Sequence, residues 1–249
     1  MAKKRRLKKK SKKALLLIVC IALFFVTADT VRYVYLSNKK FTPVEHHEED
    51  YYYAYDFGFL DKKSDTDYNN NGKDDYTDIL IGLKEFAKKN PQYTNKYYAG
   101  GYPDEGEGVC TDTVWFAIDN AGYNLKNMID KDIEENKEEY NIEIIDQNID
   151  FRRVGNQQIF FEKYVKSLTT DIEEVMEFNP GDILTFNGDE HIAMVSDKRN
   201  IKGIPYLIQN RDETQEEKEE DRLEITDMKV TGHYRFTYNK KLEKLIKSL

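Results

Sequence analysis

The sequence predicts an α+β fold, with helices in the first part of the chain and an antiparallel sheet after them. In the first part, apolar residues recur at helical spacing, as at Val114, Ala117, Ile118 and Ala121. After residues 179–181 the apolar segments become short, rich in β-branched residues and separated by turn signals. Helices followed by strands are typical of an α+β domain.

Each element has its own signal in the sequence. Four helices are expected, over residues 79–89, 110–121, 126–140 and 158–168. Asn90-Pro91 ends the first of them, and Gly122 suits the left-handed turn after the second. A loop is expected over residues 148–156, and four strands over residues 182–186, 191–197, 205–210 and 229–238. The acidic run Asp212 to Glu224 predicts a solvated hairpin loop.

The N-terminus predicts export. Residues 1–13, MAKKRRLKKKSKK, carry 9 of the 38 Lys and Arg residues and no acid, and the apolar run Ala14 to Val26 follows directly. This is the pattern of a secretory signal or signal anchor, with the basic flank in the cytoplasm and the rest outside. The run is shorter than the roughly 17–25 residues of a spanning helix, and Val26-Thr27-Ala28 is a passable cleavage site. The protein is therefore expected to be extracytoplasmic, either single-pass membrane anchored or secreted.

Charge excludes nucleic acid as a partner. After residue 13 the chain carries the other 29 Lys and Arg residues and all 46 Asp and Glu residues. Such a body repels a phosphate backbone, so the basic run is a topology signal. Five segments are expected: a basic N-terminus with signal or anchor (1–36), a linker (37–64), a calcium-loop-like segment with a helix (65–90), a catalytic domain (91–240) and a C-terminal tail (241–249).

Cys110 is the candidate nucleophile. Cys20 lies in the apolar run, so Cys110 has no disulfide partner in the exported part. It follows a glycine-rich loop at the start of a predicted helix, where unpaired N–H groups lower a thiol pKa and can hold an oxyanion. The competing interpretation is a packed small hydrophobic residue.

His191 is the candidate base. It opens a predicted strand, and Gln209 and Asn210 end the neighbouring one. Because adjacent strands lie about 4.8 Å apart, either amide side chain is within reach of the imidazole and can orient it. A second histidine, His233, lies mid-strand and is expected to be structural.

Four motifs in order resemble known families. Residues 97–101 (YYAGG) and 108–112 (GVCTD) resemble the nucleophile loop of the NlpC-type cell-wall peptidases, and PGDILTF with HIAMV resembles their strand pair. A closer resemblance is to bacterial domain-of-unknown-function family 1287, through residues 108–112, 148–154 and 231–235. The resemblance implies a papain-like fold with the nucleophile helix packed on an antiparallel sheet. Gln209-Asn210 stands where that family usually has His-Asn, which leaves the orienting residue open.

Three further residues are candidates for binding substrate. Tyr97 belongs to the loop motif, and Arg152 and Arg153 offer bidentate pairing to a carboxylate of an acidic stem peptide. Pairing of the two arginines with local acids is an equal alternative. Asp112 is expected to cap the Cys110 helix.

Residues 67–78 resemble a calcium loop of the dockerin type. The expected ligands, at alternating positions, are Asp67, Asn69, Asn71, the Lys73 carbonyl, Asp75 and Asp78, with Gly72 at the sharp turn. Asp78 replaces the usual bidentate Glu, which implies weak binding. The alternative is an Asx-rich turn that caps the following helix.

Export and resemblance together predict a cysteine peptidase or amidase that cleaves an amide in the cell envelope, with peptidoglycan stem peptide as substrate and no cofactor for catalysis. The membrane is the other expected partner, through the N-terminal segment. Two alternatives stay open: a noncatalytic envelope-binding module, and a thiol acyltransferase on the same fold.

Overall fold

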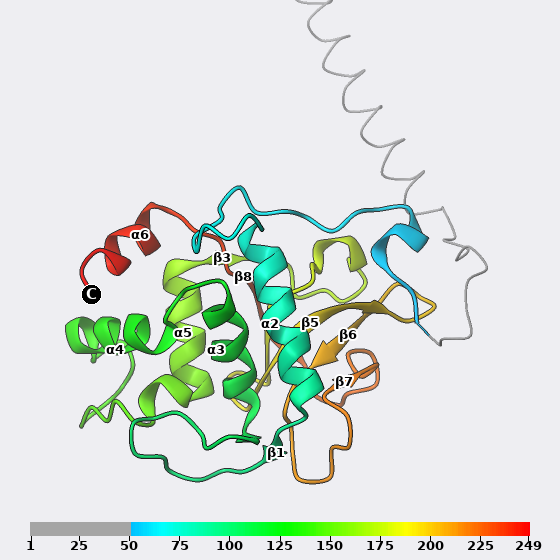
Figure 1. Ribbon diagram of the computed structural model, residues 1–249. Coiled ribbons are helices and arrows are strands. Elements are labelled where there is room, and N and C mark those ends of the chain that lie inside the picture. Colours follow the sequence, from blue (N-terminus) through cyan, green and yellow to red (C-terminus); the bar gives the residue numbers. More distant parts are fainter. Residues whose placement is uncertain (1–50) are drawn as a thin grey trace, which may run out of the picture. The chain divides into compact units, whose positions relative to one another are not determined.

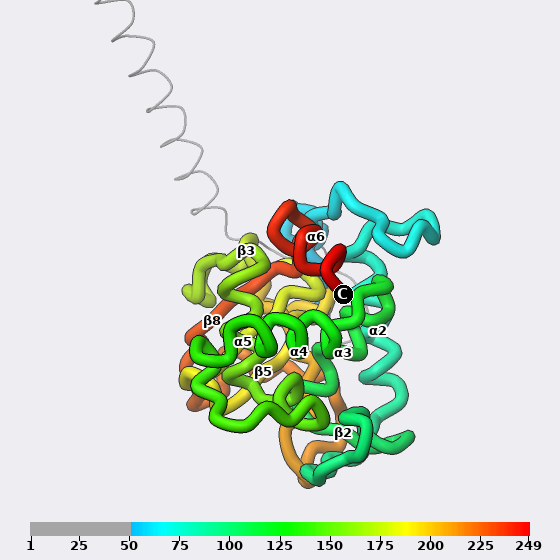
Figure 2. Tube along the Cα trace, turned by 90° about the vertical axis from the view of Figure 1, so that its left-hand side faces the viewer, coloured from blue at the N-terminus to red at the C-terminus, as the bar shows by residue number. Residues whose placement is uncertain are grey.

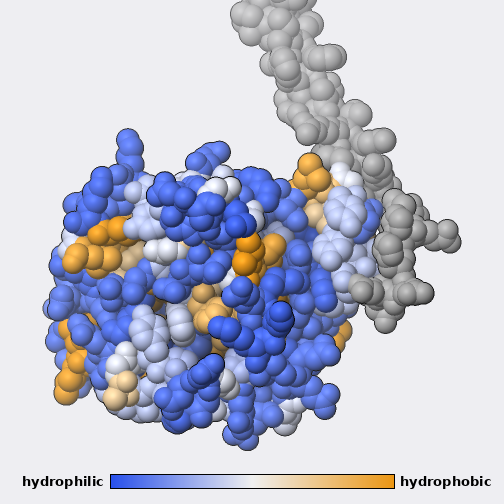
Figure 3. Space-filling model, in the orientation of Figure 1, coloured by the Kyte–Doolittle hydropathy of each residue, from blue (hydrophilic) through white to orange (hydrophobic). Residues whose placement is uncertain are grey.

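The computed structural model describes residues 51–249. The predicted signal or anchor and the first half of the predicted linker lie outside the described residues. Within residues 51–249, no helix combines the length and the apolar character needed to cross a bilayer. The face of the described part seen in Figure 3 is mostly hydrophilic, with apolar side chains in small separate groups.

A six-stranded antiparallel sheet carries the helices on one side (Figures 1 and 2). Its strands, in spatial order, are β3 (Lys166–Ser167), β8 (Val230–Arg235), β4 (Ile183–Phe186), β5 (His191–Arg199), β6 (Pro205–Ile208) and β7 (Glu219–Glu220). The helices are α2 (Asp75–Lys89), α3 (Cys110–Asn120), α4 (Leu125–Asn136), α5 (Val154–Tyr164) and α6 (Lys240–Ile246). Short 3-10 helices are η1 (Ala54–Phe57), η2 (Asp150–Arg152) and η3 (Val175–Glu177). This architecture confirms the predicted α+β class.

Side chains alternate between the two faces of β5, as they must in a strand. Ile192 and Met194 join the core under the helices, whereas Ala193 and Val195 join a second cluster on the opposite face. The first cluster holds α3 against β5. The ring of His191 lies beside Phe186, a member of the second cluster.

Helices α2 and α3 pack closely because Gly82 has no side chain. A Cβ atom at Gly82 would lie 2.6 Å from the Cβ of Asn120 and 3.1 Å from the carbonyl oxygen of Ala117. Helix α2 starts at Asp75, four residues before the predicted start, because the side chain of Asp74 caps it by accepting from Thr77 N–H. The close approach of α2 at Gly82 fixes the position of α3, the helix that begins with Cys110.

The helix expected over residues 158–168 is α5, at Val154–Tyr164, and residues 166–167 form β3. Three expected segments also differ. Residues 51–64 were expected to be linker, yet Tyr52 pairs with Arg199 of β5 and Phe57 is buried. The tail 241–249 contains most of α6, which buries Leu242 and Leu245. The acidic run 212–224 is not simply a solvated loop, because it includes β7 and two buried residues that precede it. In each of these three segments, a few apolar or amide side chains contact residues that are distant in the sequence.

Candidate active site

Cys110 is the first residue of α3, and this helix packs against β5. The side chain of Asp112 accepts a hydrogen bond of 2.8 Å from Val109 N–H, which fixes the start of the helix and confirms the expected capping role. The half-buried Cys110 packs against the core cluster that includes Ile192 of β5. Ile192 directly follows His191, so the packing of α3 on β5 brings together the two elements that begin with Cys110 and His191.

The thiol is held in its neutral form. Burial raises the pKa of Cys110 to about 11, and the charge of Asp112 adds to this, while the N–H groups of Ile192 and Thr111 act the other way. The expectation of a lowered pKa was based on the helix N-terminus alone. In the structure burial outweighs it, so any nucleophilic attack requires a base to remove the proton.

His191 has the protonation state of a base. The buried ring lies with Nε2 2.7 Å from Gln209 Oε1. Burial lowers the pKa of His191, against the opposing effect of the Gln209 hydrogen bond, so the imidazole is neutral at pH 7. Since Gln209 Oε1 accepts, Nε2 carries the proton and Nδ1 keeps a lone pair. Within residues 51–249, the Gln209 contact is the sole hydrogen bond of this ring.

Gln209 and Asn210, the two candidates for the residue that orients His191, have different partners. Gln209 contacts His191, whereas the fully buried Asn210 donates from Nδ2 to the carbonyls of Gly108 (2.9 Å) and Pro91 (3.3 Å). Asn210 therefore tethers the loop before Cys110 and does not contact the imidazole.

Tyr93 is a residue that the sequence analysis missed. It lies half-buried on β1 (Gln92–Tyr93), which pairs with β2 (Glu107–Gly108) immediately before the Cys110 helix. Burial raises the pKa of Tyr93, and negative charge on Cys110 raises it further. A two-residue strand leaves no periodic signal, and no local pattern indicated this residue.

The two arginines differ in role. Arg152 is buried and binds Asp112 bidentately, with Nε–Oδ1 at 2.9 Å and Nη2–Oδ2 at 2.7 Å, so it takes the local-acid alternative. The side chain of Arg153 is 60% exposed and lies 3.4 Å from Asp150. Tyr97 is also exposed, and its hydroxyl donates to Asp146. Of the three substrate-binding candidates, Arg153 and Tyr97 are accessible.

The proline-glycine-aspartate motif has a structural explanation. Asp182 is buried and accepts from Arg235 Nε (2.7 Å) and Nη2 (2.6 Å), and it lies 2.9 Å from His233 Nε2. His233 also contacts the Thr169 carbonyl through Nδ1 and stacks on Phe178. The position of His233 agrees with the expected structural role, and the cluster fixes β4 against β8.

Residues 67–78 form a tight loop whose polar side chains converge. Asp67 accepts from the N–H groups of Asn71 (3.0 Å) and Gly72 (2.8 Å), and Gly72 has a φ of +89°. Asn69 and Asn71 both donate to Asp78 Oδ2, at 2.9 and 2.8 Å. Lys73 lies on the same turn, donating its N–H to Asn71 Oδ1.

Asp75 has a partner in the core as well as in the loop. Its carboxylate accepts from Tyr68 N–H (2.8 Å) and from the buried hydroxyl of Tyr123 (2.7 Å), so it anchors the loop to the core. Within residues 51–249, no three His, Cys, Asp or Glu side chains form a metal-binding group.

Comparison with known proteins gives a family and a relative. The family model "Domain of unknown function (DUF1287)" matches residues 82–236. "Uncharacterized protein YijF" of Escherichia coli strain K12 is 30% identical over 154 residues, which cover 59% of this chain and 73% of that protein. No solved structure matches. The matched region contains Cys110, His191 and Gln209, whereas the loop 67–78 lies outside it.

Proposed function

Because the chain belongs to the family of domain of unknown function 1287, we propose a function from its own site: a cysteine hydrolase that cleaves an amide in the cell envelope. The observation that carries the proposal is the packing of α3, which begins with Cys110, against β5, which begins with His191, the ring that Gln209 holds. A papain-like fold of the NlpC type is part of the proposal, supported by the order of the motifs and by the helix-on-sheet arrangement.

The proposed reaction has two halves. His191 Nδ1 takes the thiol proton as Cys110 Sγ bonds to the amide carbonyl carbon, and the backbone N–H of Cys110 stabilises the oxyanion. The C–N bond then breaks, and His191 gives the proton to the leaving amine. Water attacks the thioester, His191 takes its proton, and the thiol is restored as the carboxylic acid leaves. Gln209 keeps the ring in the tautomer that this proton transfer needs.

The proposed substrate is a peptidoglycan stem peptide, reached outside the cytoplasm by a chain anchored or exported through residues 1–36. The basic run and the apolar run support this location. The exposed Arg153 is the residue available to pair with a substrate carboxylate.

The test is amine release from purified peptidoglycan by the full-length protein. We expect new amine ends with the wild type and none with Cys110→Ala or His191→Ala. Release of amine without a matching gain of free carboxylic acid would instead indicate transfer of the acyl group to a second nucleophile, the acyltransferase alternative. A wild type that binds peptidoglycan and releases nothing would overturn the proposal.

A noncatalytic envelope-binding module is the second candidate. The raised pKa of Cys110 favours it, because a neutral, half-buried thiol is also what a packed cysteine has. In that case Cys110→Ala should bind peptidoglycan as well as the wild type does.

We also propose that the loop 67–78 binds Ca²⁺ as a structural ion. The convergence of Asn69 and Asn71 on the buried Asp78 supports it, since rotation of the two amides would turn their oxygens toward a cation. Asp67 and the Lys73 carbonyl would complete the oxygen set.

A further inference from the structure

Gln209 has a second partner behind the candidate active site. Its Oε1 accepts from His191, and its Nε2 donates to Glu220 Oε2 at 3.3 Å. The same carboxylate oxygen accepts from Gln215 Nε2 at 2.9 Å. Hydrogen bonds therefore link Glu220 on β7 through Gln209, the residue after β6, to the imidazole of His191 on β5.

The orientation of the Gln209 amide decides the chemistry of His191. If the amide were turned around, its NH₂ group would face the ring, and Nε2 of His191 would have to accept. The ring proton would then lie on Nδ1, which could no longer take the thiol proton. An ionised carboxylate can only accept hydrogen bonds, so Glu220 admits only the orientation that presents Oε1 to the imidazole.

We propose that Glu220 is a positioning residue that acts through Gln209 to keep His191 in the Nε2–H tautomer. The proposal rests on the proposed hydrolase function for its catalytic consequence, although the tautomer itself can be measured without a substrate. Glu220 does not touch the reacting atoms. It acts by holding the amide that holds the base.

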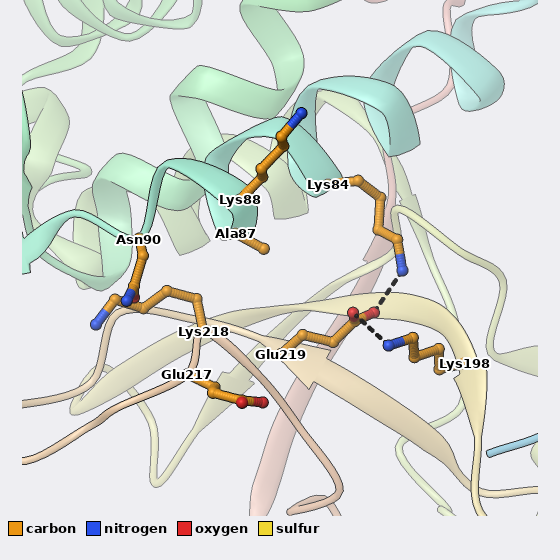
Figure 4. Close-up of a pocket in the computed structure, with 8 residues that line it drawn as sticks. All are labelled: Lys84, Ala87, Lys88, Asn90, Lys198, Glu217, Lys218 and Glu219. Carbon is orange, nitrogen blue, oxygen red and sulfur yellow. Dashed lines mark hydrogen bonds and ion pairs between the residues drawn. The ribbon is translucent and has the colours of Figure 1, made fainter. Parts of the chain in front are cut away.

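The strand that carries Glu220, β7, is held in place by its other residue, Glu219. In the sheet register Glu220 lies opposite Leu207, so it shares a face with Gln209, which is two residues further along the chain and just past the end of β6. Its neighbour Glu219 points the other way, where Lys84 of α2 (2.6 Å) and Lys198 of β5 (3.2 Å) bind it (Figure 4). These two ion pairs fix β7 without using Glu220.

Other charged groups near the pair are also accounted for. Glu220 and Asp212 oppose the effect of burial, which lowers the pKa of Lys218. Arg211 lowers and Asp212 raises the pKa of His191, both less than burial does. Arg211 and Asp212 change the pKa of His191 through their charge. Glu220 instead acts on His191 through the amide of Gln209, so Glu220 affects which ring nitrogen carries the proton.

The test compares Glu220→Gln with Glu217→Gln, a matched control at an exposed position of the same segment. Nitrogen NMR of the His191 ring at pH 7.5 reports the tautomer directly. We expect Nε2–H alone in the wild type and the control, and a mixture with Nδ1–H in Glu220→Gln. With activity as the readout, Glu220→Gln should lower kcat about tenfold with KM unchanged, a part of the roughly 10²–10⁴-fold that a general base supplies.

Two further variants keep the outcome decisive. Glu220→Asp retains the charge but its side chain is too short to reach Gln209, so we expect it to have the same effect as Glu220→Gln. It serves as the test if Glu220→Gln does not fold. In a Gln209→Ala background, Glu220→Gln should have no further effect on the tautomer or on kcat. An unchanged tautomer in both Glu220 variants overturns the inference, even in an active enzyme. A changed tautomer in a protein without hydrolase activity supports the inference and refutes the proposed function.

Discussion

The side-chain amide of Asn210 donates a hydrogen bond of 2.9 Å to the backbone carbonyl of Gly108, two residues before Cys110. The preceding residue, Gln209, binds His191. Two consecutive residues directly after β6 thus hold the two halves of the candidate site. Asn210 fixes the loop before α3, and Gln209 fixes the imidazole.

Removal of the Asn210 amide should destabilise the protein. Asn210→Ala removes the side-chain donor to the carbonyls of Pro91 and Gly108, of which Gly108 keeps a hydrogen bond from Thr94 N–H, and a buried polar group left unsatisfied costs about 1–3 kcal/mol. We expect a loss of that order in the free energy of unfolding, measured by urea denaturation. Gln209→Ala is the control and should instead alter the His191 tautomer. An unfolding midpoint of Asn210→Ala equal to that of the wild type would contradict the tether.

The neighbouring arginines offer a matched pair for stability. Arg152→Ala leaves the buried carboxylate of Asp112 unpaired, and breaking a buried ion pair costs about 3–5 kcal/mol. Arg153→Ala removes an exposed side chain and should stay within about 0.5 kcal/mol of the wild type. Chemical denaturation of both variants checks this. Similar losses in the two would mean that the Arg152–Asp112 pair contributes little.

Alkylation of Cys110 should be slow in the folded protein. The ordinary pKa of a cysteine thiol is about 9, so about half of the thiol is ionised at pH 9 in an unfolded chain. With a pKa of about 11 in the folded protein, only about 1% of the Cys110 thiol is ionised at that pH. Iodoacetamide labelling of the Cys110 peptide, read by mass spectrometry, should therefore be much faster after denaturation, and in the folded state it should rise as pH increases from 9 to 11. Fast labelling of the folded protein at pH 7 would indicate a preformed thiolate–imidazolium pair and contradict the neutral resting state.

Calcium should raise the melting temperature through Asp67. A ligand at ten times its Kd stabilises the folded state by about 1.4 kcal/mol, and we expect a Ca²⁺-dependent rise in the wild type at millimolar Ca²⁺. Asp67→Ala should abolish the rise. Asp65→Ala, an exposed acid outside the loop, should keep it. Asp75 is unsuitable as a probe because it anchors Tyr123. No rise in the wild type would leave the loop as a helix-capping turn.

Local patterns predicted much of this molecule. The periodicity around Val114 and the turn at Gly122 identified α3, and short β-branched runs identified four of the six strands of the main sheet. The same motifs indicated Cys110, His191 and Gln209. These signals are local because helix and strand periods are properties of neighbouring residues.

The contacts that complete the site were not predictable in this way. Tyr93 lies on a strand of two residues, and Glu220 lies in an acidic run whose composition indicated solvent exposure. Arg152 could be assigned to Asp112 only with coordinates, since 40 residues separate them in sequence. The pKa of Cys110 depended on burial, which a helix N-terminus in the sequence does not report.

The most direct test of covalent catalysis is the mass of Cys110 during turnover. Full-length protein is mixed with peptidoglycan fragments, quenched in acid within the first turnovers and digested, and the peptide that contains Cys110 is weighed. We expect an added mass equal to the acyl part of the substrate in the wild type, and none in His191→Ala. Substrate cleavage without any adduct on this peptide, or with equal rate in Cys110→Ala, would contradict the account.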